Sequence, residues 1–484
     1  EGIVTPTTEE VSRSPAAAAG TAAWRPPAPV PQAERPGFWA FFAALQDNPI
    51  TAFAEEAYRE PLVRRDAVGF IPDVVLVTDP ALVRRVFVEK VSTYGKGRVV
   101  RRRLQPMLGD GILIAEEASW RGQRRVIQPL FRPRLTRDFL PDMQAAVDGA
   151  AERLARAAAG EGVVDLTAEM NALTYDVIAR TAFSGDTIED PVAFSEAIGA
   201  YFDTLGRVDL ASYLNLPDWV PTLGRLRARP ALRLFRRQVG GIIANRRALI
   251  AREGLEAAPA DLLTALLTTP DPETGRPMSD DHVYWNAVVF LAAGHETTSN
   301  TLQWTLFLLS THPEWDRRVA DECRALVPAG APDAAALDRL VETRMVVEEA
   351  LRLYPPVPFI PRMPDTPDEV AGRPIRRGSV VFTSPFITHR HRAYWDAPDH
   401  FRPERFAPEA RERIVPNTYF PFGVGPRACL GARFAMQEVL AALATLMPRF
   451  RFETVDPQSV WPQATITLKP RSPLRMRVRP RAEG

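Results

Sequence analysis

The sequence predicts a mainly helical fold with small β-sheets. Residues 139–260 read as successive helices. The run 279–312 predicts one helix of about thirty residues, which at 1.5 Å per residue is roughly 45 Å long, the span of a whole domain. Near the C-terminus, residues 474–479 alternate between apolar side chains and arginine, which indicates a half-buried strand that can form a hairpin with the preceding residues 465–468.

The composition is that of an ordinary globular protein. The chain has 484 residues, of which 46% are hydrophobic and 25% charged, and its net charge of +1 gives no general affinity for nucleic acid or acidic membranes. Its two cysteines, Cys323 and Cys429, exclude a disulfide scaffold. No stretch reaches the ~20 apolar residues that span a bilayer, and no signal pattern is visible. We therefore expect a cytoplasmic monomer.

The first elements follow from local signals. Residues 1–36 are rich in Ala and Pro and predict a flexible arm, of which 24–31 should be extended and mobile. The aromatic segment 37–45 predicts a helix packed on the body, with contact to a membrane surface as the alternative. The run 73–78 predicts a short strand, and residues 80–89 predict a helix that opens with proline.

A basic cluster comes next, formed by Arg98, Arg101, Arg102 and Arg103. The favoured interpretation is a solvated face. The alternative is a clamp for the carboxylate of a ligand. Further on, Trp120 and Arg124 lie four residues apart and therefore share one helix face.

The middle of the long predicted helix is polar, because residues 295–300 interrupt its apolar flanks. Burying such groups is costly unless they are hydrogen-bonded. A threonine inside a helix can bond to the carbonyl four residues earlier, which for Thr297 is that of Ala293. A local opening of the helix beside a bound metal would make room for a small ligand.

Glu349 and Arg352 lie three residues apart on a predicted helix. Any exposed helix can carry such a pair, at a gain of about 0.2–0.5 kcal/mol.

The segment Phe422–Gly431 reads Phe-Gly-Val-Gly-Pro-Arg-Ala-Cys-Leu-Gly. Its glycines and proline predict a tight loop, and residues 432–447 predict a helix. Cys429 therefore lies at a helix N-terminus, where free N–H groups and the helix dipole stabilise a thiolate. Arg427 is a cation suited to a carboxylate. The alternative is a buried, inert cysteine.

The spacing F-x-x-G-x-R-x-C-x-G resembles that of the cytochrome P450 family, whose haem iron is held by such a cysteine. Further family motifs follow in order over about four hundred residues. They are W-x-x-x-R at Trp120–Arg124, Ala-Gly-His-Glu-Thr-Thr at 293–298, E-x-x-R at Glu349–Arg352 and Pro-Glu-Arg-Phe at 403–406.

The resemblance implies the cytochrome P450 fold in a single domain, 37–484, with haem between the long central helix and the cysteine loop. It makes Cys429 the ligand of the metal, and it makes Glu296 and Thr297 the catalytic residues that deliver protons to dioxygen. The other residues expected to contact the cofactor are Trp120, Arg124, Ala293, Arg362, His389, Phe422 and Arg427.

The resemblance implies further details. Glu349, Arg352 and Arg405 should form a buried network, and residues 214–226 should form a lid over the substrate channel. In one fatty-acid-hydroxylating branch a glutamate bonds covalently to haem, but Ala293 occupies that position here, so we expect non-covalent haem b. The alternative interpretation of His389 and His391 is a metal site, although no further ligand cluster supports it.

The implied function is that of a haem-thiolate monooxygenase, which inserts one atom of dioxygen into a C–H bond or a double bond of an apolar substrate. A peroxide-driven peroxygenase would usually replace the acid–threonine pair with Arg-Pro, and a haem sensor would not need the pair. No flavin or iron–sulfur module is visible. Electrons should therefore come from a separate ferredoxin or flavodoxin with its NAD(P)H reductase, docked near Cys429.

Two segments of the sequence bear on the class of substrate. Residues 104–114 look like the same region in fatty-acid- and alkane-hydroxylating branches, and an arginine among 98–103 could hold a carboxylate head. We therefore expect a fatty acid or similar alkyl compound, with terpenoids and steroids as alternatives. The expected pocket residues are all apolar, namely Phe290, Ala293, Val357, Phe359 and Ile466.

Overall fold

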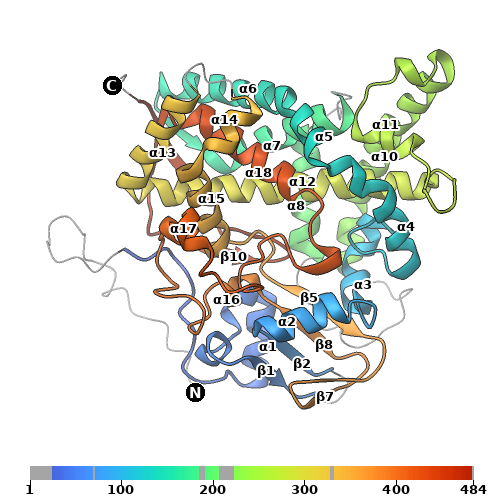
Figure 1. The fold of residues 1–484 in the computed structure, drawn as a ribbon, viewed down its shortest axis with the longest axis vertical. Helices are drawn as coiled ribbons and strands as arrows, with labels where there is room; N and C mark the ends of the chain where they lie inside the picture. Colours follow the sequence, from blue (N-terminus) through green and yellow to red (C-terminus); the bar gives the residue numbers. More distant parts are fainter. Residues whose placement is uncertain (1–23, 69–70, 185–190, 206–222, 328–331, 482–484) are drawn as a thin grey trace, which may run out of the picture.

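The computed structural model describes residues 24–68, 71–184, 191–205, 223–327 and 332–481. Figure 1 shows a large helical part beside a smaller part that holds most of the strands. The prediction of a mainly helical fold with small sheets is confirmed. The predicted lid, 214–226, falls mainly on residues outside the described ranges. None of the described helices has the length and apolar character needed to cross a membrane.

Helix α12, Asp280–Ser310, is the long central helix that the sequence predicts. It begins after Ser279, whose hydroxyl accepts the His282 N–H, and ends before Pro313. Most of its side chains are buried, because α7, α15 and α18 pack around it. Figure 1 shows it crossing the helical part with α7 and α18 alongside.

The region 139–260 is helical over its described residues, as predicted, apart from one short strand, β4 (Val163–Asp165), that the sequence reading missed. The helices of the helical part are α4 (Glu117–Ile127), α5 (Pro133–Asp138), α6 (Leu140–Ala158), α7 (Leu166–Phe183), α8 (Pro191–Leu205), α10 (Leu223–Glu253), α11 (Leu262–Thr268), α13 (Pro313–Leu326), α14 (Ala334–Arg339), α15 (Val341–Leu353) and α18 (Ala432–Leu446).

The strand-rich part is built on a five-stranded sheet in the order β1-β2-β8-β5-β3. The predicted strand at 73–78 is confirmed as β2, which pairs in parallel with β8, with Val74 opposite Val380. The five strands are β1 (Leu62–Arg65), β2 (Val74–Val77), β3 (Tyr94–Gly95), β5 (Ile360–Pro364) and β8 (Val380–Thr383). Short helices flank this part, namely α1 (Phe38–Asp47), α2 (Pro80–Arg84), α3 (Gly97–Leu108), α16 (Pro385–Thr388) and α17 (Pro408–Arg411). A small pair of strands, β6 (Asp368–Val370) and β7 (Arg373–Ile375), completes it.

The C-terminal strand is confirmed, but its predicted partner is wrong. In β12 (Arg475–Pro480), Met476 and Val478 are buried while the arginines between them are exposed. The predicted hairpin with residues 465–468 does not form, because β12 pairs with β4 and β9 (Phe450–Thr454). Residues 465–467 instead form the turn between β10 (Pro462–Ala464) and β11 (Leu468–Pro470). Prolines at 470 and 473 lack the N–H that would continue the ladder toward β12.

Residues 24–36 of the arm lie against the body. The ring of Trp24 packs against Phe307 and His312, and the Tyr354 hydroxyl donates a hydrogen bond to the Pro27 carbonyl at 2.8 Å. These contacts hold a segment that the sequence reading expected to be mobile. The basic cluster differs from its prediction at one residue, since Arg102 is buried in α3, whereas Arg98 is exposed.

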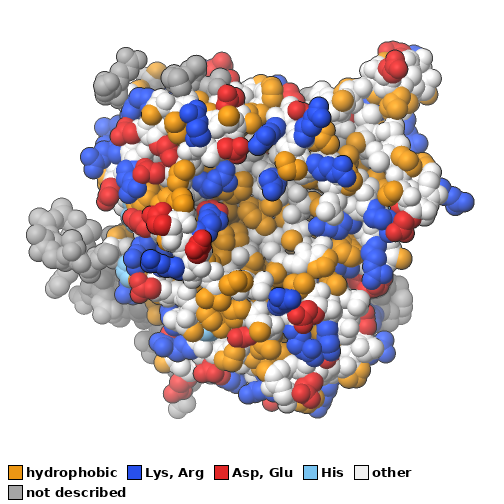
Figure 2. Space-filling view, viewed as in Figure 1, with side chains coloured by type: hydrophobic (Ala, Val, Ile, Leu, Met, Phe, Trp, Pro, Cys, Tyr) orange, Lys and Arg blue, Asp and Glu red, His pale blue; other side chains and the backbone are white. Residues whose placement is uncertain are grey.

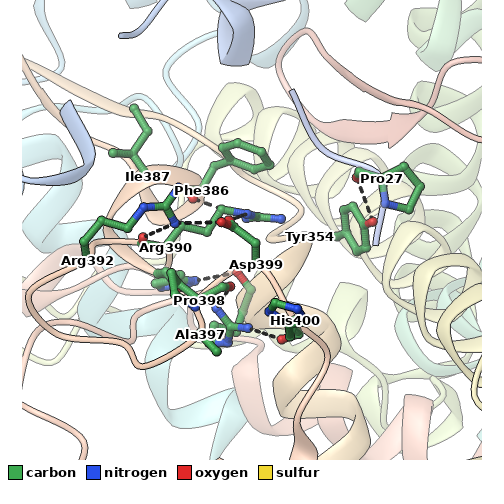
Figure 3. A network of polar contacts seen from close by, with 12 residues as sticks. Pro27, Tyr354, Phe386, Ile387, Arg390, Arg392, Ala397, Pro398, Asp399 and His400 are labelled. Carbon is green, nitrogen blue, oxygen red and sulfur yellow. Dashed lines mark hydrogen bonds and ion pairs between the residues drawn. The ribbon is translucent and has the colours of Figure 1, made fainter. Parts of the chain in front are cut away.

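Glu349 and Arg352 form a buried ion pair in α15, not a surface pair. Arg352 donates two hydrogen bonds to the Glu349 carboxylate, at 2.6 and 2.8 Å, and Arg405 lies 3.5 Å from the same carboxylate. Arg352 also donates to the carbonyls of Pro398 and His400, and Arg405 donates to that of Ala397. Figure 3 shows the adjoining contacts, in which Arg392 lies beside the Asp399 carboxylate. Removing one partner would leave a buried charge, which costs about 3–5 kcal/mol. The network fixes the segment that leads to the cysteine loop.

Candidate active site

The cysteine segment turns sharply before α18. The Cys429 N–H donates to the Phe422 carbonyl at 2.8 Å, which closes the loop. Gly425 has a φ of +74°, and a Cβ there would lie 2.4 Å from the Phe87 carbonyl oxygen, so only glycine fits. Cys429 is exposed to a hollow of about 440 Å³. The hollow is lined by Arg124, Arg125, Gln128, Pro129, Phe131, Arg132, Pro133, Cys429, Leu430, Ala432 and Arg433.

The acidity of Cys429 differs from the sequence prediction. Burial by the surrounding segment raises the pKa of the thiol, while the Gly431 N–H and the Arg124 guanidinium act to lower it. A metal ion bound to the sulfur would remove the proton outright.

Cationic and aromatic side chains gather beside the cysteine segment, as W-x-x-x-R predicts. The Arg427 guanidinium lies 4.4 Å from the centre of the Trp120 ring, and that of Arg124 lies 5.8 Å from it. Arg427 also donates to the Ala115 carbonyl at 2.8 Å, and Arg124 to the Ala428 carbonyl at 3.2 Å. The structure thus brings Arg427 of the cysteine segment next to Trp120 and Arg124, a pair that lies far earlier in the sequence.

Two more cations join this group, Arg362 from β5 and Lys96 before α3. Burial, and then the charge of Arg427, lower the pKa of Arg362 to about 10. Burial, and then Arg362 and Arg427, hold the pKa of Lys96 well below its usual value. Glu116 offsets these charges only in part, and the Nε atoms of Arg362 and Arg427 are buried without a hydrogen-bond partner in the structure. Such a cluster indicates an anionic ligand.

Lys96 and Glu116 were missed by the sequence reading. Lys96 stands between Gly95 and Gly97, and a Cβ on Gly95 would lie 2.9 Å from the Glu116 carboxylate. The Gly97 N–H donates to Glu116 at 3.1 Å. The signal available in the sequence was a lysine flanked by two glycines, which allows close approach of the backbone.

Helix α12 has an open face at the position where its polar stretch begins. Ala293 is exposed and Thr297 half-buried, although the side chains around them on the helix are mostly buried. The Thr297 hydroxyl donates to the Ala293 carbonyl at 2.6 Å, as predicted. A bond of this kind satisfies the threonine hydroxyl within the helix and can bend the helix locally.

The two residues before Thr297 on the polar stretch, His295 and Glu296, face other elements. The Glu296 carboxylate is buried and accepts a hydrogen bond from the Thr467 hydroxyl at 2.7 Å, in the turn between β10 and β11. Burial lowers the pKa of His295 to about 4, so this imidazole is neutral at pH 7. Thr297 is therefore the polar side chain on the open face, with Glu296 beside it.

Phe131 connects the open helix to the cysteine segment. Its ring contacts Phe290 of α12 edge to face, with centres 5.8 Å apart, and it lines the hollow beside Cys429. Leu430 packs against the hydrophobic cluster that contains Phe290. The sequence motifs around Cys429 and Thr297, more than a hundred residues apart, thus belong to one site.

The comparisons with known proteins agree with this arrangement. A family model described as cytochrome P450 matches residues 67–477. The chain belongs to the cytochrome P450 family. It is 32% identical over 414 residues to cyclooctatin synthase of Streptomyces melanosporofaciens, covering 84% of this chain and 86% of that protein. It is 30% identical over 413 residues to human cytochrome P450 4F2, covering 79% and 77%. The solved structure of the cytochrome P450DA heme domain superposes with a TM-score of 0.80 at 27% identity, covering 95% of this chain and 99% of that one.

This cytochrome P450 is a monooxygenase, an oxidoreductase that requires a haem-thiolate cofactor, an organic substrate, dioxygen and an electron donor. The residues present fit haem. The propionates of haem are carboxylates. The positive charges of Lys96, Arg362 and Arg427 are offset only in part by the Glu116 carboxylate, so further carboxylates would be bound favourably there. Cys429 provides the accessible sulfur.

One predicted cofactor contact, His389, is wrong. Its side chain is fully buried, and its Nε2 accepts the Phe420 N–H at 2.9 Å. Its Nδ1 lies 3.3 Å from the Arg352 carbonyl, to which it donates. Burial, and then Arg352, hold the pKa of His389 well below its usual value. A neutral imidazole with both nitrogens engaged cannot bind a propionate, so His389 braces the cysteine loop instead. The alternative metal site at His389 and His391 lacks a third ligand among the described residues.

Proposed function

We propose that this cytochrome P450 hydroxylates or epoxidises an apolar substrate of the fatty-acid or alkyl class. The observation that supports the chemistry is the open face of α12, where Ala293 is exposed and its carbonyl accepts a hydrogen bond from the half-buried Thr297 hydroxyl. A site for dioxygen needs such a space beside the metal, with a proton donor at its edge.

The cofactor of the proposal is non-covalent haem b. Cys429 would ligate the iron, and Trp120, Arg124, Lys96, Arg362 and Arg427 would hold the propionates. Ala293 offers no carboxyl group for a covalent bond to the porphyrin. Bound haem supplies the activation of dioxygen that no amino-acid side chain can provide.

Proton delivery is assigned to Thr297 and Glu296. The Thr297 hydroxyl is half-exposed on the open face, so it can reorient from the Ala293 carbonyl toward a bound ligand. The Glu296 carboxylate is buried one residue earlier and is held by Thr467. A proton that this carboxylate takes up from water can be passed on to the threonine hydroxyl, which keeps the hydroxyl as donor.

Electrons are proposed to arrive through a separate, acidic donor of the ferredoxin or flavodoxin type, with its NAD(P)H reductase. The hollow beside Cys429 is edged by Arg124, Arg125, Arg132 and Arg433. Figure 2 shows basic side chains on this face, where α4 and α18 lie. Positive charge around the point of nearest approach to the metal attracts an acidic partner.

The substrate proposal rests on the apolar lining and on the basic cluster of α3. Phe290 is buried, while Val357, Phe359 and Ile466 are half-buried apolar residues. Burial of an alkyl chain gains about 0.8 kcal/mol per methylene, or roughly 10 kcal/mol for twelve before the costs of binding. Arg98 is exposed and lies near the start of α3.

The test is a titration of the haem-loaded protein with saturated fatty acids of increasing length, followed through the spin state of the iron. Affinity should rise with each methylene, because each adds buried apolar area. Affinity should fall for the matching methyl esters, since a clamp of arginine needs the charge of the carboxylate. A flat response over the whole series would overturn the fatty-acid proposal.

A second candidate is a cyclic terpenoid or steroid. The observation that favours it is the 32% identity to a relative named for the synthesis of cyclooctatin. A clear spin-state response to a terpene or steroid, together with a flat response to fatty acids, would select this candidate. The monooxygenase assignment would be unaffected.

A further inference from the structure

Three parts of the chain meet at a buried pair of amide side chains, Asn286 of α12 and Gln123 of α4. Asn286 has no exposed surface, and Gln123 is 3% exposed. The Asn286 Nδ2 donates to the Gln123 Oε1 at 2.7 Å and to the His282 carbonyl at 2.8 Å. Buried amides with these contacts fix the relative position of the elements that carry them.

The third part is the connection 109–116 between α3 and α4. The Ile112 N–H donates to the Asn286 Oδ1 at 2.9 Å, and the Gln123 Nε2 donates to the Asp110 carbonyl at 2.7 Å. Each amide therefore binds the connection once and its partner amide once. At the outer edge, Asp110 accepts a hydrogen bond from Ser119.

The connection fits tightly on α12. Gly109 has a φ of +54°, and a Cβ there would lie 2.0 Å from the Trp285 ring. A Cβ on Gly111 would lie 2.9 Å from the Val289 side chain. The backbone of 109–111 thus rests directly on the turn of α12 that holds Asn286.

The other end of the connection is tied to the cysteine segment. Arg427, two residues before Cys429, donates to the Ala115 carbonyl at 2.8 Å. The connection therefore runs from α12 to the cysteine segment and borders the region between these two elements. Between its two anchored ends, Leu113 is 41% exposed, although Ile114 and Ala115 are buried.

We propose that Asn286, assisted by Gln123, is a positioning residue that sets where 112–115 lie relative to α12 and thereby determines which ligands fit beside the metal. The inference rests on the chain being a haem monooxygenase but not on any particular substrate. Neither amide contacts the reacting atoms. They act through the Ile112 N–H and the Asp110 carbonyl, which hold the segment that carries Leu113.

The test uses Asn286→Leu, which keeps the size of the side chain and removes its polar atoms. In the haem-loaded protein without substrate, hydrogen–deuterium exchange of the Ile112 amide should accelerate by about tenfold or more, because its acceptor is gone. The ratio of the dissociation constants for imidazole and 4-phenylimidazole, two ligands of different size for the iron, should change by about fivefold or more.

The matched control is Gln303→Leu, which removes an equally buried amide from the same helix. Gln303 binds Thr167 and Ser299 and makes none of these contacts to 109–116, so both measurements should stay at their original values. If Asn286→Leu fails to take up haem, Gln123→Met tests the same claim through the Asp110 carbonyl. Unchanged exchange overturns the proposal, and so does faster exchange with an unchanged ratio.

Discussion

The variant Cys429→Ala is expected to lose the carbonmonoxy spectrum of a haem-thiolate protein completely. Cys429 is the cysteine that opens onto the hollow beside the cation cluster, and its loop is closed by the bond to the Phe422 carbonyl. Alanine keeps the backbone but provides no ligand for iron. The measurement is the difference spectrum of the reduced protein with and without carbon monoxide.

Cys323→Ser is the matched control. Cys323 is fully buried in α13, and its thiol lies 3.5 Å from the Thr343 hydroxyl. Burial raises the pKa of this thiol to about 12, so it stays protonated and cannot replace Cys429. The control should keep haem and the haem-thiolate spectrum. A spectrum like that of the unaltered protein in Cys429→Ala would show that the metal ligand has been misassigned.

The variant Thr297→Ala is expected to lower the product formed per electron consumed by roughly 10²–10⁴-fold, the usual contribution of a positioned proton donor. Haem and substrate should still bind, because the hydroxyl donates its hydrogen bond within its own helix, to the Ala293 carbonyl. The electrons that no longer form product should appear as hydrogen peroxide. The measurement compares product, peroxide and reductant consumed in the same reaction.

Thr305→Ala provides the control for a loss of helix stability. Its hydroxyl makes the same kind of bond, to the Thr301 carbonyl at 2.7 Å, but it is fully buried two turns away from the open face. Coupling of electrons to product should remain normal in this variant. If Thr297→Ala kept its yield of product per electron, proton delivery would have to be assigned to another group.

Local spacing in the sequence predicted much of the fold and the site. The length of α12 follows from apolar flanks and from Ser279 at its start, and the bond from Thr297 to Ala293 follows from helix geometry alone. The burial of Glu349 with Arg352 did not follow from spacing, since an exposed helix can carry the same pair. It was predicted only because the family motif supplied Arg405 as a third partner.

The errors concern contacts between segments that are distant in the sequence. His389 resembles a cofactor ligand until its bonds to Phe420 and Arg352 are seen. Lys96 joins the cluster of cations that contains Arg362 and Arg427. It does so because α3 begins beside β5, which brings Lys96 close to Arg362. The C-terminal strand was predicted from its alternation, but one of its partners, β4, lies far away in the sequence, and the other is β9. Side-chain patterns define a strand without naming its neighbour.

The central claim is that this chain activates dioxygen with electrons from an external donor. Its most direct test is to supply the haem-loaded protein with a ferredoxin or flavodoxin, the matching reductase, NAD(P)H, a compound that shifts the spin state of the iron, and ¹⁸O₂. We expect the protein to consume dioxygen only when reductant is present, and we expect one ¹⁸O atom to enter the product. Product formed from hydrogen peroxide alone, without reductant-dependent uptake of dioxygen, would indicate a peroxygenase. Binding of dioxygen without turnover under any of these conditions would indicate a sensor, and either result would contradict the account.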